Sequence, residues 1–332
     1  MRPLLHIARS RATIARPLLR YYSTPSETFI KVNDIPAPGS GRIRILSLSR
    51  PSARNAISTT LLQQLRENVQ SIAEEYDDYG DEVPSKETYG GAAGPDVKGP
   101  TRAVIIASEV DSCFCAGADL KERKKMSENQ VNHFLESLRN TFSDLCALPV
   151  PTISAISSLA LGGGLELALC TTFRVLASTA QVGLPETRIG IIPGAGGTFR
   201  LPPMIGQARA RDLILTGRRV AAPEAYFLGI ANRLVEVVPE EGEAEPELLK
   251  RAGDDVLKEA VKLARDICEG APRAIRASLA ATGPRVKLES GNPSGRGPAL
   301  EIKMYDRVVN TEDRNEALKA FAEKRRPVFT GK

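Results

Sequence analysis

The stretch Leu-Ala-Leu-Gly-Gly-Gly-Leu-Glu-Leu-Ala-Leu, residues 159–169, runs from an apolar segment through three glycines into a segment of helical character. A similar turn, Cys-Ala-Gly-Ala-Asp-Leu at 115–120, also separates a predicted buried strand from a predicted helix. The first N–H groups of a helix lack intrahelical acceptors, and the helix dipole adds positive potential there. Two facing turns would offer two donors to an oxygen that gains negative charge during a reaction. Taken alone, each turn is better explained by glycines that permit tight packing.

Two glutamates accompany these turns. Glu166 lies two residues after Gly164, in an otherwise apolar helical segment where an unpaired carboxylate is costly. Glu186 lies in the loop sequence Gly-Leu-Pro-Glu-Thr-Arg-Ile-Gly between apolar stretches. Plainer interpretations exist, because the helix dipole favours a first-turn glutamate and because Glu186 could pair with Arg188 on the surface. Neither glutamate identifies a reaction by itself.

Histidine is nearly absent from the chain. The 332 residues include only His6 and His133, and His6 lies in an N-terminal segment that we expect to be removed. Ser-His-Asp triads and histidine-rich metal sites are therefore close to excluded. If the protein is an enzyme, carboxylates or lysines have to transfer its protons.

The first 22 residues differ in composition from everything that follows. They contain no acidic residue, and leucine, isoleucine and alanine separate five arginines: Arg2, Arg9, Arg11, Arg16 and Arg20. This pattern predicts a mitochondrial transit peptide over 1–22, cleaved before Ser23, and hence a matrix protein; a basic amphipathic surface helix is the alternative. Without those arginines the basic residues number 40, equal to the 40 acidic residues. The net charge of the full chain is therefore poor evidence for nucleic-acid binding.

The cysteines indicate core thiols. Their number is odd and no C-x-x-C pair occurs, which argues against a disulfide framework and a metal site: Cys113, Cys115, Cys146, Cys170 and Cys268. No apolar run reaches the roughly 18 residues that a membrane-spanning helix needs, so we predict no membrane segment.

Alternating strand-like and helix-like segments predict an α/β core over 23–238 and a helical region over 248–332. Residues 23–40 are expected to be a flexible entry, and 77–100, rich in glycine, proline and acid, an exposed loop insertion. Strands are predicted over 42–49, 103–108 and 149–157, and helices over 59–76, 127–146, 166–177, 209–217, 254–270, 271–282 and 301–327.

Together these segments resemble the enoyl-CoA hydratase/isomerase (crotonase) superfamily. The resemblance runs from about residue 42 to 332 and rests on three blocks in fitting order: FCAGADLKE, ALGGGLELAL and GLPETRIGIIPGAGGTFRLP. It implies an α/β fold of the crotonase (ClpP-like) type, a spiral of β-β-α units. The helical C-terminal region would then build a homotrimer or a hexamer made of two trimers.

The resemblance also implies a set of site residues. The backbone N–H groups of Ala118 and Gly163 would form an oxyanion hole, and Glu166 and Glu186 would be the catalytic carboxylates. Residues near the coenzyme A moiety would be Ala118, Asp119, Leu120, Lys121 and, from a C-terminal helix, Lys324.

The implied reaction is hydration of a 2-enoyl-CoA thioester without a separate cofactor, because coenzyme A is part of the substrate. Glu186 would exchange the proton at C2, and Glu166 would help to activate the water that attacks C3. Family members that only shift a double bond tend to keep one of the two glutamates. The segments FCAGADLKERKKMS and LPVPTI are most similar to the branch that converts 3-methylglutaconyl-CoA to 3-hydroxy-3-methylglutaryl-CoA in leucine breakdown.

Two alternatives remain at this point. One is a short-chain enoyl-CoA hydratase or an enoyl-CoA isomerase of fatty-acid oxidation. The other is an RNA-binding protein on the same fold, since some relatives have been linked to RNA through lysines on an early helix. The corresponding segment 59–76 carries Arg66 and no lysine, so RNA binding is not expected. The chain also has Thr172 where the family often has an aspartate.

Overall fold

The apolar run 103–108 forms the centre of the molecule. In the computed structural model it lies within β3 (Thr101–Ser108), an inner strand of a six-stranded sheet. Successive side chains of a strand point to opposite faces, so Val104 and Ile106 pack into one apolar cluster and Ile105 packs into another. The sheet is therefore covered on both sides.

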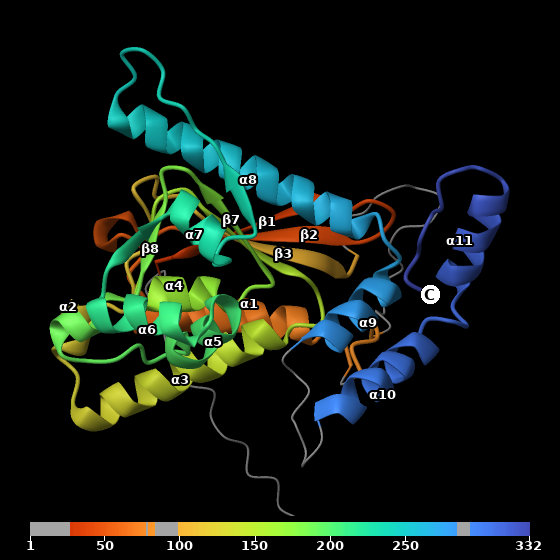
Figure 1. Ribbon diagram of the computed structural model, residues 1–332, viewed down its shortest axis with the longest axis horizontal. Coiled ribbons are helices and arrows are strands. Elements are labelled where there is room, and N and C mark those ends of the chain that lie inside the picture. Colours follow the sequence, from red (N-terminus) through yellow and green to blue (C-terminus); the bar gives the residue numbers. More distant parts are fainter. Residues whose placement is uncertain (1–26, 78, 84–98, 284–292) are drawn as a thin grey trace, which may run out of the picture.

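The structure describes residues 27–332 except 78, 84–98 and 284–292 (Figure 1). The predicted transit peptide and most of the predicted loop insertion lie outside these described residues. None of the described helices is long and apolar enough to cross a bilayer.

Two sheets share the strands. The six-stranded sheet contains, in spatial order, β1 (Ile30–Pro36), β2 (Arg42–Leu48), β3, β5 (Thr152–Ile156), β7 (Phe173–Ala177) and β10 (Arg233–Val235). The four-stranded sheet contains β4 (Cys113–Cys115), β6 (Leu159–Leu161), β8 (Gln181–Gly183) and β9 (Arg219–Ala221). Only β1 and β9 run antiparallel to their neighbours in these sheets.

The chain repeats one pattern three times. The pairs β3–β4, β5–β6 and β7–β8 each place one strand in each sheet and then lead into helices, among them α3 (Glu128–Ala147), α4 (Gly163–Ala168) and α5 (Gly197–Ile205). These repeats are the β-β-α units that the sequence resemblance implied.

Helices cover both faces of the six-stranded sheet (Figure 1). α8 (Glu245–Cys268) lies along one face, while α1 (Thr59–Ala73) and α3 lie on the other side. Ser58 caps α1 by accepting the N–H of Leu61 at 3.2 Å. The remaining helices are η1 (Pro51–Ala53), α2 (Leu120–Arg123), η2 (Pro185–Ile189), α6 (Gln207–Thr216), α7 (Ala222–Leu228), α9 (Pro272–Thr282), α10 (Pro293–Asp306) and α11 (Glu312–Ala322).

Three local predictions were wrong. The predicted helix 166–177 ends at Ala168, and its second half is strand β7, because an apolar run shows no period that distinguishes a buried helix from a buried strand. The predicted flexible entry contains edge strand β1, which is held by its pairing with β2. The predicted helix 301–327 is divided between α10 and α11, and Thr311 caps the second part.

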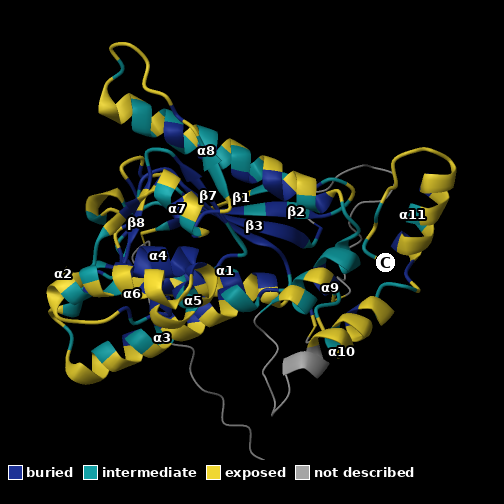
Figure 2. Cartoon of the chain, in the orientation of Figure 1, coloured by how far each residue is buried: buried dark blue, intermediate teal, exposed yellow. Residues whose placement is uncertain are grey.

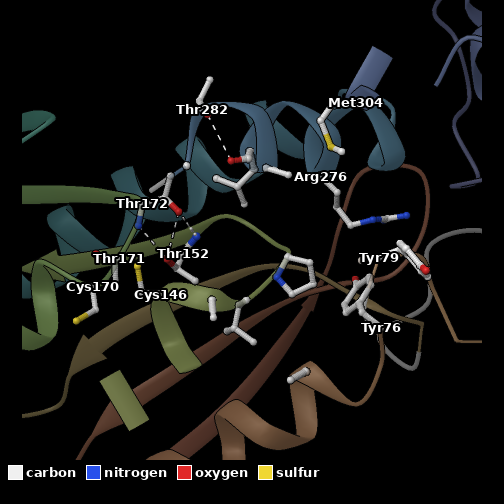
Figure 3. A pocket seen from close by; sticks show the side chains of 18 of the residues that line it. Tyr76, Tyr79, Cys146, Thr152, Cys170, Thr171, Thr172, Arg276, Thr282 and Met304 are labelled. Atoms are coloured by element: carbon white, nitrogen blue, oxygen red, sulfur yellow. Dashed lines mark hydrogen bonds between the residues drawn. The ribbon is translucent and has the colours of Figure 1, made fainter. Parts of the chain in front are cut away.

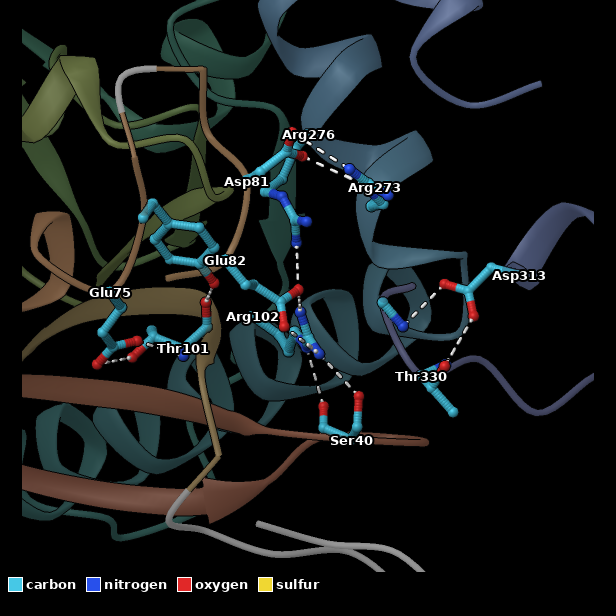
Figure 4. Close-up of polar contacts among 12 residues, drawn as sticks. Ser40, Glu75, Asp81, Glu82, Thr101, Arg102, Arg273, Arg276, Asp313 and Thr330 are labelled. Carbon is cyan, nitrogen blue, oxygen red and sulfur yellow. Dashed lines mark hydrogen bonds and ion pairs between the residues drawn. The ribbon is translucent and has the colours of Figure 1, made fainter. Parts of the chain in front are cut away.

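Ionic contacts join the C-terminal helices to the core (Figure 4). Glu82 contacts Arg102 of β3 and, at 2.9 Å, Arg276 of α9. Both arginine side chains are only 4 % exposed. Asp81 pairs with Arg273 of α9 at 3.2 Å. Two guanidinium groups inside the protein therefore depend on one carboxylate.

Replacing Glu82 with glutamine should destabilise the fold by about 3–5 kcal/mol, because it leaves two buried cations without their shared anion. Urea unfolding at pH 7 measures this loss. The matched control is Asp212→Asn, which breaks a pair with Arg218 whose side chains are 38 % and 49 % exposed. The control should change stability by less than about 1 kcal/mol, and an equally small loss for Glu82→Gln would contradict the prediction.

Candidate active site

Three neighbouring parallel strands bring the predicted site residues to one edge of the four-stranded sheet. β6 lies between β4 and β8 and is parallel to both. The turn 116–119 follows β4, Gly162 follows β6, and Leu184–Glu186 follow β8. Carboxyl ends of parallel strands meet at the same edge of a sheet and are the usual place for ligands in α/β folds. Segments far apart in the sequence are therefore adjacent here.

Glycines allow the first two turns to touch. A Cβ atom added at Gly117 would lie 3.2 Å from the Gly163 nitrogen, and one added at Gly163 would lie 3.5 Å from the Ala118 nitrogen. At Gly164 an added Cβ would lie 2.1 Å from the carbonyl oxygen of Cys115. Among the described residues, neither the Ala118 nor the Gly163 N–H donates a hydrogen bond. Two neighbouring donors are thus available to a ligand.

Glu166 projects from α4, a helix that is buried along its whole length (Figure 2). The residue is 2 % exposed. Its Oε1 accepts the backbone N–H groups of Ala195 and Gly197, both at 2.8 Å. Burial raises the pKa of Glu166, whereas these N–H groups and the charge of Arg200 act in the opposite direction. A buried carboxylate is thus stabilised by a loop rather than by a direct ion pair.

Glu186 lies in η2 and is 7 % exposed. A Cβ added at Gly162 would lie 3.1 Å from its Oε1, and its Oε2 has no hydrogen-bond partner among the described residues. The pKa of Glu186 is raised to about 7, mainly by burial and in smaller part by the negative charge of Glu166. The alternative interpretation, that Glu186 pairs with Arg188 on the surface, is wrong, because Arg188 donates its Nε to the carbonyl oxygen of Thr216 at 2.6 Å.

The two carboxyl groups therefore share one electrostatic environment beside the two free amides. Glu166 has two N–H donors on one oxygen, whereas Glu186 has a buried oxygen that no donor in the described part of the chain reaches. This difference suits Glu166 to the ionised form and Glu186 to the protonated form.

The other predicted substrate contacts differ in their surroundings. Asp119 is occupied as the N-cap of α2, where it accepts two backbone N–H groups, and it pairs with Arg50 at 2.8 Å. Leu120 and Lys121 are exposed at the start of α2. Lys324 follows α11, which lies across the molecule from α2 and α4 (Figure 1). The structure thus does not bring Lys324 to the other site residues within one chain.

The glycine-rich loop 194–197 is the part of the site that sequence reasoning missed. In the sequence it was noted only as part of the block GLPETRIGIIPGAGGTFRLP, with no role assigned to it. In the structure, this loop supplies both hydrogen bonds to Glu166. Two adjacent glycines just before a helix were the signal that could have indicated exposed N–H donors.

A separate cavity of about 870 Å³ lies at the other end of α4 (Figure 3). Neither Glu166 nor Glu186 lines this cavity. Its lining includes Arg276 of α9 and Met304 of α10. Thr172 and Thr152 exchange hydrogen bonds there, each backbone N–H donating to the other hydroxyl at 2.9 and 3.2 Å. These hydrogen bonds give Thr172 a structural role. In the described part of the chain, no group of His, Cys, Asp or Glu is arranged to hold a metal ion.

The paired β-β-α repeats and the carboxylate–amide site define a class of enzyme, and comparison with known proteins identifies it. The chain belongs to the enoyl-CoA hydratase/isomerase family, whose model matches residues 97–332. The crotonase fold and an enzyme of the enoyl-CoA hydratase type, a hydro-lyase, are thereby confirmed.

Particular relatives are closely similar. The whole chain is 57 % identical to methylglutaconyl-CoA hydratase 1, mitochondrial, of Pyricularia oryzae, covering 96 % of that protein. It is 52 % identical to an enoyl-CoA isomerase/hydratase of Zymoseptoria tritici, over 94 % of this chain and 91 % of the relative. The crystal structure of an enoyl-CoA hydratase from Bacillus anthracis is 35 % identical, with a TM-score of 0.74 over 92 % of this chain and 100 % of that one.

Proposed function

We propose that this enzyme hydrates 3-methylglutaconyl-CoA to 3-hydroxy-3-methylglutaryl-CoA, a step of leucine breakdown. The observation that carries the reaction type is that two buried, electrostatically coupled carboxyl groups lie near two amides that have no acceptor among the described residues. The 57 % identity to a methylglutaconyl-CoA hydratase supports the choice of acyl group.

The two amides act on the thioester. Its carbonyl oxygen accepts the N–H groups of Ala118 and Gly163, which draws electron density from the double bond and makes C3 electrophilic. Each donor stabilises the developing enolate by about 3 kcal/mol. The donors stand in place before the substrate arrives, so no reorganisation is needed as charge develops.

The two glutamates transfer the protons. Glu166, in its ionised form, takes a proton from the water whose oxygen bonds to C3. Glu186, in its protonated form, gives its proton to C2 of the enolate. Transfer of one proton from Glu166 to Glu186 then restores the starting state. The water is thus added across the double bond without a histidine or a separate cofactor.

Coenzyme A would extend along Ala118 to Lys121. A contact with Lys324 would require a second copy of the chain, which fits the proposed homotrimer or hexamer. A location in the mitochondrial matrix is supported by the arginine-rich start and by the mitochondrial name of the Pyricularia relative.

Steady-state hydration assays test the acyl group. Purified protein should show a kcat/KM for 3-methylglutaconyl-CoA at least tenfold above that for crotonyl-CoA, since about 1.4 kcal/mol of recognition suffices for this ratio. A preference for crotonyl-CoA would indicate a short-chain hydratase. Turnover only of 3-enoyl-CoA, without uptake of ¹⁸O from labelled water, would indicate an isomerase.

The pH dependence of hydration should be bell-shaped. The acid limb reports Glu166, which must be ionised, and the alkaline limb reports Glu186, which must be protonated and has a pKa of about 7. Above pH 7, kcat/KM for hydration should fall about tenfold per unit. Dehydration should fall in parallel, because it uses the same singly protonated pair with the proton on Glu166 instead of Glu186. Measuring kcat/KM in both directions from pH 5 to 9 checks this, and an activity that stays constant from pH 7 to 9 would contradict it.

A further inference from the structure

Two arginines bind the outer side of the loop 194–197. Arg139, from α3, donates its Nε to the carbonyl oxygen of Gly194 at 2.8 Å. Arg200, from α5, donates Nη1 to the carbonyl oxygen of Ala195 at 2.8 Å. The opposite side of the loop donates its N–H groups to Glu166. The loop therefore lies between two cations and one carboxylate.

One peptide group takes part in both sets of contacts. The carbonyl of Gly194, which accepts from Arg139, and the N–H of Ala195, which donates to Glu166, belong to the same planar peptide unit. A cation on the carbonyl end of a peptide polarises it and strengthens the N–H as a donor. Charge on Arg139 is thus transmitted to Glu166 through two hydrogen bonds and one peptide.

The position of the Arg200 guanidinium is electrostatically unfavourable for its own helix, α5. The guanidinium folds back over the N-terminal end of its own helix, where a Cβ added at Gly196 would lie 1.6 Å from Nη1. A cation at a helix N-terminus opposes the helix dipole. Within the described residues, neither Arg200 nor Arg139 has a carboxylate as an ion-pair partner. The negative charge of Glu166, on the other side of the loop 194–197, offsets the unfavourable position of the Arg200 cation.

We propose that Arg139 and Arg200 are positioning residues for the reaction: they bind carbonyls of the loop 194–197 so that its N–H groups hold Glu166 as the ionised base. Arg200 has the larger effect because it is half-buried, while Arg139 is exposed and its charge is screened by water. The catalytic role of the two arginines rests on the proposed hydration. The hydrogen bonds from the loop 194–197 to Glu166 do not depend on the substrate.

The test compares Arg200→Gln, Arg139→Gln and Arg200→Lys with the wild type. Arg200→Gln should move the acid limb of kcat/KM upward by about 0.5–1 pH unit, less than the 1–3 units of a direct ion pair. Activity one unit below the wild-type limb should then fall about three- to tenfold, with the alkaline limb moving less. Arg139→Gln should produce a smaller shift, and Arg200→Lys should restore most of the wild-type profile.

A second measurement separates this inference from the hydration itself. Infrared difference titration of the protein without substrate, with the Glu166 band assigned from Glu166→Gln, should show the same upward shift in Arg200→Gln. The matched control is Arg211→Gln, which removes one exposed arginine of the neighbouring helix α6. If Glu166 titrates alike in Arg200→Gln and in the control, the arginines are structural and the inference is wrong. Shifted titration without any hydration activity would overturn the proposed function instead.

Discussion

Glu186→Gln is expected to lower kcat for hydration by about 10²–10⁴-fold, the usual contribution of a positioned acid or base. The amide matches the carboxyl group in size but cannot give a proton to C2. Glu166→Gln should cause a loss of the same order, because an amide cannot take a proton from water. Fixed-time assays with the preferred thioester at pH 7 measure the loss of kcat in both variants.

Stability measurements show whether Glu186→Gln remains folded. The pKa of Glu186 is raised from 4.5 to about 7 in the folded protein, so the folded state keeps a proton that the unfolded state loses. This group therefore weakens the fold as pH rises from about 4.5 to about 7. Relative to wild type, the variant should gain stability across that window.

The control for both glutamates is Glu67→Gln on the exposed side of α1, where Glu67 accepts a hydrogen bond from the amide of Gln63. It should retain wild-type activity. Near-wild-type hydration by either active-site variant would mean that the corresponding glutamate transfers no proton in the limiting step. Loss of only one proton-exchange step in either variant would favour the isomerase.

Gly164→Ala is expected to reduce both activity and stability strongly. The added Cβ would lie 2.1 Å from the Cys115 carbonyl oxygen and 2.8 Å from its carbonyl carbon, which are backbone atoms that cannot turn aside. β4 and α4 would have to separate, at a cost of about 1–3 kcal/mol or more. The Ala118 and Gly163 amides would separate with them, and a 1 Å misplacement can reduce the rate about 100-fold. Thermal unfolding and hydration assays measure the two effects.

Gly253→Ala is the matched control. This glycine lies within α8, and its added Cβ would meet Asp111 Oδ1 at 3.8 Å and Ser157 Oγ at 3.9 Å, which are ordinary contacts. Alanine in a helix interior should stabilise the protein by about 0.5–1 kcal/mol. If Gly164→Ala behaved in the same way, the close approach of β4 and α4 would not be essential for the site.

Sequence patterns predicted individual elements well where the pattern was local. The helix predicted over 59–76 is α1, and it begins at Thr59 as predicted, where the side chain of Ser58 accepts the N–H of Leu61. Strand β7 was missed because Phe173–Ala177 continue the apolar run of α4 without a break in period. Edge strand β1 was missed because its order comes from pairing with β2, a partner that no pattern within residues 30–36 reveals.

For the site, the sequence by itself determined which chemical groups were available. With two histidines in the chain, proton transfer had to fall to carboxylates or lysines, and the glycine turns indicated where backbone donors could lie. Only the tertiary structure decided how Glu166 and Glu186 differ. The loop 194–197 gives Glu166 two N–H donors, whereas one oxygen of Glu186 has no donor within the described ranges. Hydrogen bonding and burial set a pKa only after distant segments have packed together.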